Sequence, residues 1–186
     1  MEIRIYFGCC ALLLLFACFE RNPPQPPQIY INHFNPDLVQ TDYGWLYKNQ
    51  PFSGYMVERE RNGQIVYQLP IIKGKENGRA IGMYNTGEKL MTCNFVEGKR
   101  EGIFQQWWPN GRLRYLFTYH QGNYQGTQWV YFPNGRVQGE KNYSGGKEEG
   151  VQKIWDSTGK LLSNYSVKNN ILYGTVSSKD CMPVIH

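Results

Sequence analysis

Hydrophobic and polar residues alternate along several short segments of the chain, each bounded by glycine. In segment 112–119, four apolar side chains occupy alternate positions: Leu113, Tyr115, Phe117 and Tyr119. A period of two places such side chains on one face of a β-strand. The same phase recurs in segments 65–71, 91–95 and 161–167, and it weakens in 137–143. The pattern therefore predicts many short strands rather than helices.

Glycine recurs with a period of 24 residues, in three separate series. The first series is Gly54, Gly78, Gly102, Gly126, Gly150 and Gly174. The second is Gly63, Gly87, Gly111, Gly135 and Gly159, and the third is Gly74, Gly98, Gly122 and Gly146, continued by Asn170. A fixed period of this length indicates stacked copies of one supersecondary unit.

Each series has a conformational interpretation. In the second, Pro109-Asn110-Gly111 suits a type I turn whose glycine takes the left-handed position that closes a three-residue hairpin loop. The third series ends in Asn170, and Asn is the residue other than Gly that best tolerates positive φ, so a second left-handed turn is expected. We interpret the first series as allowing close backbone approach where the next strand begins.

The expected fold is all-β: an elongated, meandering antiparallel sheet of 24-residue β-hairpin repeats over residues 41–177. Hairpin tips are predicted near residues 62, 86, 110, 134 and 158. One period before Tyr67, Leu69 and Ile71 stand Tyr43, Trp45 and Tyr47, so a half-repeat should open the array. Residues 178–186 form a C-terminal tail in this scheme.

The N-terminus carries a targeting pattern. Residues 5–17 are an apolar run of 13, too short to span a membrane comfortably but suited to the core of a signal peptide. Leu15-Phe16-Ala17-Cys18 resembles the lipobox of bacterial lipoproteins. The resemblance implies that residues 1–17 are a signal peptide and that Cys18 is lipidated; ordinary secretion and an uncleaved anchor are the alternatives. Residues 18–40 then form a tether, because four prolines within 23–27 favour an extended conformation.

Composition fits this scheme. The chain has 20 Gly, and 15% of its residues are aromatic, which suits short strands joined by tight turns. Its net charge of +5 is scattered, so we favour a mixed solvated surface over a patch that binds nucleic acid or an anionic membrane. No nucleic-acid partner is expected.

Catalytic chemistry has few candidates. The histidines are His33, His120 and His186, and their spacing suits no metal site. No nucleophile-elbow, phosphate-loop or zinc-helix motif occurs, so we expect no enzyme, no metal and no cofactor. Cys93 and Cys181 are 88 residues apart, which places them roughly 35 Å apart along the array, too far for a disulfide. Cys93 falls in the apolar phase and should be a small buried residue.

Two stretches carry a further resemblance: Trp108-Pro109-Asn110-Gly111-Arg112-Leu113 and Tyr143-Ser144-Gly145-Gly146-Lys147-Glu148-Glu149-Gly150. They resemble the bacterial MORN-variant repeat, found in proteins commonly labelled YwqK-family antitoxin components. The resemblance implies an open-ended sheet used for binding or scaffolding.

Three functions remain open. We expect a non-catalytic protein-interaction or scaffold module, anchored by lipid in the bacterial cell envelope and otherwise secreted. The alternatives are a glycan- or wall-binding module, or an antitoxin or immunity-type partner of a toxin. One aromatic series is the candidate binding stripe: Met83, Trp107, Tyr131 and Trp155. A second series, Tyr84, Trp108 and Phe132, should line the opposite face, and one of the two should help to form the core.

Overall fold

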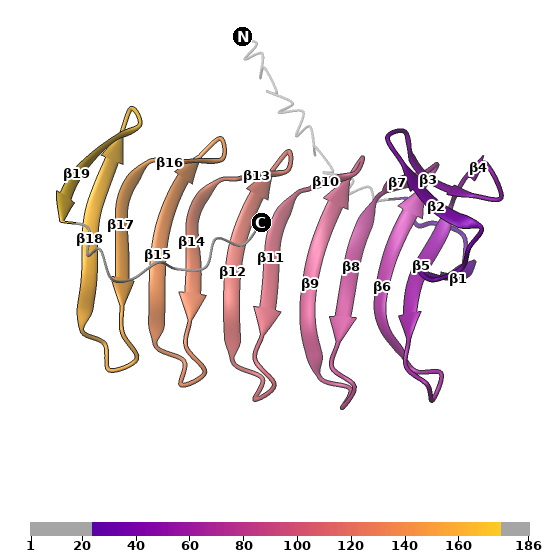
Figure 1. The fold of residues 1–186 in the computed structure, drawn as a ribbon, viewed down its shortest axis with the longest axis horizontal. Coiled ribbons are helices and arrows are strands. Elements are labelled where there is room, and N and C mark those ends of the chain that lie inside the picture. The colour runs from indigo at the N-terminus through magenta and orange to yellow at the C-terminus, as the bar shows by residue number, and fades with distance from the viewer. Residues whose placement is uncertain (1–23, 176–186) are drawn as a thin grey trace, which may run out of the picture.

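The computed structural model describes residues 24–175, in which all the regular structure is β-strand. Sixteen strands form one sheet and three form a smaller one, which confirms the all-β repeat architecture. Five antiparallel hairpins succeed one another along an elongated array (Figure 1). The long strands are β5 (Gly54–Arg59), β6 (Ile65–Ile72), β8 (Gly78–Met83), β9 (Lys89–Val96), β11 (Gly102–Trp107), β12 (Leu113–His120), β14 (Gly126–Tyr131), β15 (Val137–Ser144), β17 (Gly150–Trp155) and β18 (Leu161–Lys168).

Shorter strands complete the main sheet. A two-residue strand follows each of the first four hairpins: β7 (Lys75–Glu76), β10 (Lys99–Arg100), β13 (Asn123–Tyr124) and β16 (Lys147–Glu148). The sheet begins with β1 (Tyr30–Asn32), which is parallel to β5, and ends with β19 (Ile171–Thr175). Residues 30–41, assigned from the sequence mainly to the tether, therefore already contain strands of the folded domain.

The hairpin tips have the predicted geometry. The amide of Gly111 donates to the carbonyl of Trp108 at 2.8 Å, and the Trp108 amide donates to Arg112 at 2.8 Å. Gly111 has φ of +76°, the left-handed conformation expected for the residue that closes the loop. The same pattern of hydrogen bonds recurs at the other four tips. The prediction from Pro-Asn-Gly is confirmed.

The opposite ends of the hairpins are joined by two-residue turns in which both residues are left-handed. Gln121 has φ of +49° and Gly122 has φ of +85°, as the tight hairpin turn matching strand twist requires. The amide of Gly122 also donates to the carbonyl of Arg100, one period earlier, at 2.9 Å. Equivalent bonds run from Gly74, Gly98 and Gly146 to Phe52, Glu76 and Tyr124. These glycines therefore connect successive repeats as well as turning the chain.

The first glycine series only partly fits its interpretation. A Cβ on Gly54 would lie 2.5 Å from the carbonyl oxygen of Ile29, so close approach does exclude a side chain there. At Gly102 and Gly126, however, no atom lies within 4 Å of such a Cβ, and the prediction is wrong for them. Their φ values of +72° and +70° show what glycine supplies instead: the bend from each short strand into the next long strand.

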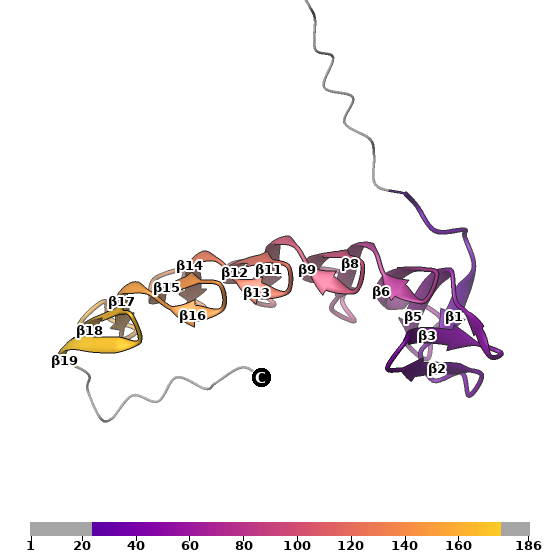
Figure 2. The same cartoon turned by 90° about the horizontal axis from the view of Figure 1, so that it is seen from above.

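This bend gives each repeat a curled cross-section (Figure 2). Tyr124 on the short strand β13 pairs with Tyr119 on β12, and the chain then turns away before β14 rejoins the sheet. Strands β12 and β14 consequently pair only at Tyr115↔Val130 and Leu116↔Trp129. The short strands thus lie along the face that carries Phe117 and Tyr119, which we call the inner face; the opposite face is the outer face.

Aromatic and aliphatic side chains form the core on the inner face. The rings of Phe104 and Phe117 stack at 5.7 Å, and those of Tyr119 and Tyr124 lie 4.8 Å apart. The sequence predicted Leu113 on this same face, and that prediction is wrong. The register shifts so that Leu113 pairs with Trp107, which moves it to the outer face. The bulge at Arg114, repeated in each hairpin, breaks the alternation that the sequence suggested.

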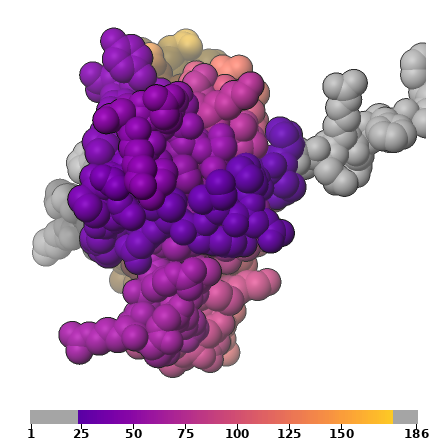
Figure 3. All heavy atoms as spheres, turned by 90° about the vertical axis from the view of Figure 1, so that its right-hand side faces the viewer, coloured from indigo at the N-terminus to yellow at the C-terminus, as the bar shows by residue number. Residues whose placement is uncertain are grey.

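A small separate sheet covers the N-terminal end of the array: β2 (Leu38–Thr41), β3 (Gly44–Tyr47) and β4 (Gln50–Pro51). Trp45 is buried in it, packs with Phe52 and Met56, and donates its indole N–H to Glu76 at 2.8 Å. Figure 3 looks at this end and shows it covered by the N-terminal segment. The predicted half-repeat therefore lies in a separate sheet, although Gly74 bonds to Phe52 as later repeats bond to one another, and Tyr43 lies exposed in a turn. Burial against the first repeat closes its otherwise open end.

Candidate interaction surface

The four residues of the predicted stripe occupy equivalent positions on one face. Met83, Trp107, Tyr131 and Trp155 are the last residues of β8, β11, β14 and β17. Each pairs with the residue that follows the neighbouring tip: Lys89, Leu113, Val137 and Leu161, respectively. Strand alternation places them opposite the inner core, so the stripe runs along the outer face near the hairpin tips. All four are half-buried.

The tryptophans of this face keep their polar atoms free. Trp45 and Trp108 donate their indole N–H groups to protein acceptors, whereas Trp107, Trp129 and Trp155 donate to none within residues 24–175. None of these three N–H groups is among the fully buried unpartnered atoms of the described residues. Indoles with one apolar side packed and a free donor are typical of interaction surfaces.

The second aromatic series holds the repeats together. The Tyr84 hydroxyl donates to the carbonyl of Trp107 at 2.8 Å, and the Trp108 indole donates to the carbonyl of Tyr131 at 3.0 Å. Each bond therefore joins one repeat to the next. Phe132 occupies the same position but has no donor. This series has a structural role, although the core itself lies at the other end of the strands.

Cations follow the tips at the positions opposite the second aromatic series: the Trp108 amide donates to Arg112 and the Phe132 amide donates to Arg136. Arg112 donates to the carbonyl of Asn134 in the next tip, and Arg136 donates to that of Thr158. Asn110 adds a parallel bond, from its amide to Pro133 at 2.9 Å. Neither arginine has an acidic partner among the described residues. Because a guanidinium has five N–H donors, each retains donors for a ligand.

Arg114 is a third cation without an acidic partner in the part of the chain that the structure describes. Its guanidinium carbon lies 4.3 Å from the centre of the Trp108 ring and 4.8 Å from that of Tyr115. Stacking of this kind stabilises the cation without neutralising its charge. The third to fifth tips are therefore basic as well as aromatic.

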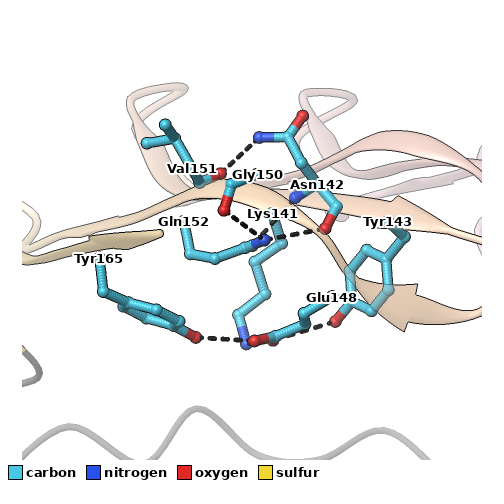
Figure 4. A network of polar contacts seen from close by, with 8 residues as sticks. All are labelled: Lys141, Asn142, Tyr143, Glu148, Gly150, Val151, Gln152 and Tyr165. Atoms are coloured by element: carbon cyan, nitrogen blue, oxygen red, sulfur yellow. Dashed lines mark hydrogen bonds and ion pairs between the residues drawn. The ribbon is translucent and has the colours of Figure 1, made fainter. Parts of the chain in front are cut away.

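A polar network occupies the inner face of the last repeats (Figure 4). Glu148, on short strand β16, accepts hydrogen bonds from Lys141 at 2.8 Å and from the hydroxyls of Tyr143 at 3.4 Å and Tyr165 at 3.0 Å. Burial and the charge of Glu148 raise the pKa of Tyr143 to about 12, and the same two causes raise that of Tyr165. With its polar groups paired to one another, the network joins two repeats and offers no free nucleophile or base.

Two buried glutamines complete the inner face, and the sequence patterns did not identify them. The Gln128 side chain accepts from the Thr118 amide at 2.8 Å and donates to the carbonyls of Gln125 and Gly126 at 3.0 and 3.1 Å. Gln152 binds the backbone of Asn142 in the same way, at 2.9 and 2.8 Å. Each glutamine fills the gap left where consecutive repeats diverge.

The remaining predicted groups lie apart from one another. His33 contacts Glu58 at 3.3 Å and His120 contacts Glu101 at 2.9 Å, on different repeats. Within residues 24–175, no three His, Cys, Asp or Glu side chains converge as a metal site would require. Cys93 is buried, and burial raises the pKa of its thiol to about 11. Cys18, Cys181 and His186 lie outside the described residues. Within residues 24–175, no helix is long and apolar enough to cross a membrane.

The comparisons with known proteins agree with this geometry. Residues 100–121 and 148–169 match the MORN repeat variant. Each matched segment begins on a short strand, contains one hairpin and ends at the return turn, and the two begin 148 − 100 = 48 residues apart, which is two periods. No curated protein matches the chain. The repeat match and the repeated all-β fold together support the assignment of this chain as a MORN-repeat protein. A match to this type of repeat module points to no catalytic family.

Proposed function

We propose that the protein is a non-catalytic interaction module that binds a protein partner through its outer face. The observation that carries this proposal is the row of half-buried aromatic residues at Trp107, Tyr131 and Trp155, whose indole N–H groups have no acceptor among residues 24–175. Half-buried Trp and Tyr side chains, with unpaired arginines at the same hairpin tips, have the composition of a protein-binding surface, where Trp, Tyr and Arg contribute most of the binding energy.

The site of action is a second part of the proposal. A lipid on Cys18 would hold the module at the bacterial cell envelope, and the proline-rich residues after it would keep the sheet away from the membrane. The open array would then present its outer face as a scaffold. This placement depends on the lipobox resemblance of residues 15–18.

A glycan partner is the second candidate, because one pair of rings favours it. Trp129 and Tyr131 stack at 6.5 Å with 25° between their planes, which makes a flat apolar platform of the kind that sugar rings can pack on. The unpaired cations at the hairpin tips favour the protein partner, since a neutral glycan would leave them unused.

Capture from envelope extract would separate the two candidates. The mature chain should retain specific proteins that survive washing, and it should not co-sediment with purified cell wall stripped of protein. Retention by the stripped wall, with no protein captured, would contradict the proposal and favour the glycan candidate. A toxin-like reading frame beside the gene would instead favour an immunity-type partner.

A further inference from the structure

One half-buried cation of the third hairpin has no acceptor for its N–H groups. Four other arginines each donate to an oxygen atom of the protein: Arg59, Arg100, Arg112 and Arg136. Arg114 donates to none within residues 24–175 and has no acidic partner there. Its Nε atom is fully buried, and neither of its Nη atoms is among the fully buried unpartnered atoms of the described residues. A guanidinium with five N–H donors is therefore left without an acceptor in this part of the chain.

The other repeats show that the fold needs no cation at this position. The residues that stand one or two periods from Arg114 are Val66, Leu90, Gln138 and Leu162, and none of them is charged. A buried N–H group without an acceptor costs free energy that an aliphatic side chain does not incur. Because Arg114 departs from its repeat at such a cost, its position points to a function outside folding.

The bulge of the hairpin aims this side chain at two aromatic rings. The register shifts between Leu113 and Tyr115, so Arg114 is the extra residue of the bulge, a feature that often re-aims a side chain. Its guanidinium carbon lies 4.3 Å from the centre of the Trp108 ring and 4.8 Å from that of Tyr115. The cation is stacked on these rings but keeps its charge.

Both rings are themselves held in place. The Trp108 indole donates to the carbonyl of Tyr131 at 3.0 Å, and the Tyr115 ring stacks on that of Phe117 at 5.1 Å. The guanidinium therefore rests on a fixed support, and little side-chain freedom remains to be lost when a ligand binds it.

The local charge specifies an anion of low charge. Residues 107–115 contain Arg112 and Arg114 but neither Asp nor Glu. In the preceding tip, Glu88 takes the position of Arg112, yet it forms no ion pair with the third tip, and hydrogen bonding to Thr86 lowers its pKa. Anionic membranes are bound by clusters of about four to eight cations, so the two at this tip match a carboxylate better.

We propose that Arg114 is the anchor of a second binding site, which takes the carboxylate of a glutamate or aspartate side chain on a protein. The planar guanidinium donates two parallel N–H···O bonds to the carboxylate. The rings of Trp108 and Tyr115 pack against the side chain that carries it. Since Tyr115 lies on the inner face, this site is separate from the outer aromatic row, and the inference does not rest on the function proposed for that row.

A fluorescently labelled octaglutamate peptide tests the site, with labelled octaserine as the uncharged control. Fluorescence anisotropy should show that the mature chain binds octaglutamate and not octaserine. Arg114→Leu should weaken the binding of octaglutamate roughly tenfold, the effect of losing one charge-assisted pair of hydrogen bonds. If octaglutamate does not bind the natural chain, the proposal is overturned, while the function proposed for the outer row still stands.

Two further variants separate a specific site from general charge. Arg61→Leu removes the same charge from the exposed first tip and should leave binding unchanged. Arg114→Lys keeps the charge but loses the flat, two-pronged donor, so it should bind octaglutamate more weakly than the natural chain does. Equal losses in Arg61→Leu and Arg114→Leu would show that net charge alone attracts the peptide and would refute the assignment.

Thermal unfolding distinguishes a binding residue from a structural one. Leucine already occupies the equivalent position in two other repeats, at Leu90 and Leu162. Arg114→Leu should therefore melt at the temperature of the natural chain or above it, because it removes the buried Nε–H that has no acceptor. A large fall in its melting temperature would make Arg114 a structural residue and overturn the proposal.

A phospholipid headgroup is the competing class of ligand. If phosphatidylglycerol vesicles bind in an Arg114-dependent manner and displace octaglutamate at matched charge, a lipid surface replaces the protein carboxylate and the proposal is wrong. Vesicle binding that is absent, or that Arg114→Leu leaves unchanged, supports the protein carboxylate.

Discussion

Gln128 offers a sharp test of how the array is held together. Its side chain is buried, with 3% of its surface exposed, and its Oε1 accepts the Thr118 amide proton across the gap between repeats. Gln128→Met keeps the approximate volume but leaves the Thr118 N–H, and the carbonyl oxygens of Gln125 and Gly126, without these partners. An unsatisfied buried donor costs about 1–3 kcal/mol, so we expect a loss of roughly 2 kcal/mol in the free energy of unfolding.

The chain contains its own control for this cost. One and two repeats earlier, the positions of Gln128 are taken by Phe104 and Ala80, and the position of Thr118 opposite Ala80 is taken by Pro70. Proline has no amide proton, so at that junction the backbone needs no glutamine. Thr118→Pro should therefore remove the part of the requirement for Gln128 that comes from the Thr118 amide.

A double-mutant cycle measured by urea unfolding gives the coupling. Gln128→Met should cost roughly 2 kcal/mol in the natural chain and distinctly less in the Thr118→Pro chain, where only carbonyl oxygens lose a partner. The same cost in both backgrounds would refute the reasoning, because the penalty would then come from packing and not from the orphaned amide.

Three further predictions concern separate parts of the molecule. Cys18→Ala should move the protein from the detergent phase to the soluble fraction in a bacterial host; soluble wild-type protein with unmodified Cys18 would contradict the lipobox assignment. Cys93 should remain free and react with thiol reagents only after unfolding, because it is buried and its pKa is raised to about 11; an intrachain bridge to Cys181 in non-reducing mass spectrometry would contradict the extended array. The contribution of the tyrosines to stability should be constant below pH 10, where tyrosine is neutral in both states. It should fall as pH rises toward 12, because burial raises the pKa values of Tyr67 and Tyr143 to about 12; tyrosinate absorbance that titrates without loss of structure would contradict this.

The sequence predicts the fold well because turn chemistry is local. Pro109-Asn110-Gly111 specifies its turn within three residues, and the 24-residue period then places every tip and strand. The alternation also identifies Phe117 and Tyr119 as core residues correctly, since it reports which side of a strand is buried.

What the sequence misses depends on contacts between repeats. The bulge at Arg114, which moves Leu113 to the outer face, leaves no mark in the alternation. Nothing in the sequence pattern marks the partners of Glu148, which the return of β16 over the inner face places between Tyr143 and Tyr165. Gln128 is likewise a polar residue at a position that is apolar in the two preceding repeats. The sequence alone does not explain it, because its partner Thr118 becomes adjacent only when the repeats stack.

The sequence predicted which residues form the candidate surface, but not what distinguishes them from the neighbouring aromatic series. The 24-residue spacing aligns Met83, Trp107, Tyr131 and Trp155, and the structure places them in one row. The sequence could not decide between this row and the Tyr84 series. That distinction comes from hydrogen bonds to the neighbouring repeat, which Tyr84 and Trp108 make.

The central claim is that the outer aromatic row is a binding surface and not a part of the core. The decisive measurement compares Trp107→Ala and Trp155→Ala with Phe117→Ala, recording for each the melting temperature and the capture of protein from envelope extract. Phe117 is a core residue with 5% of its surface exposed, so its truncation should cost about 3–5 kcal/mol and lower the melting temperature strongly. We predict that the two tryptophan variants lose partner capture while melting within about 4 °C of the natural chain. A large loss of stability in both tryptophan variants, comparable to that of Phe117→Ala, would assign the row to the core and contradict the claim.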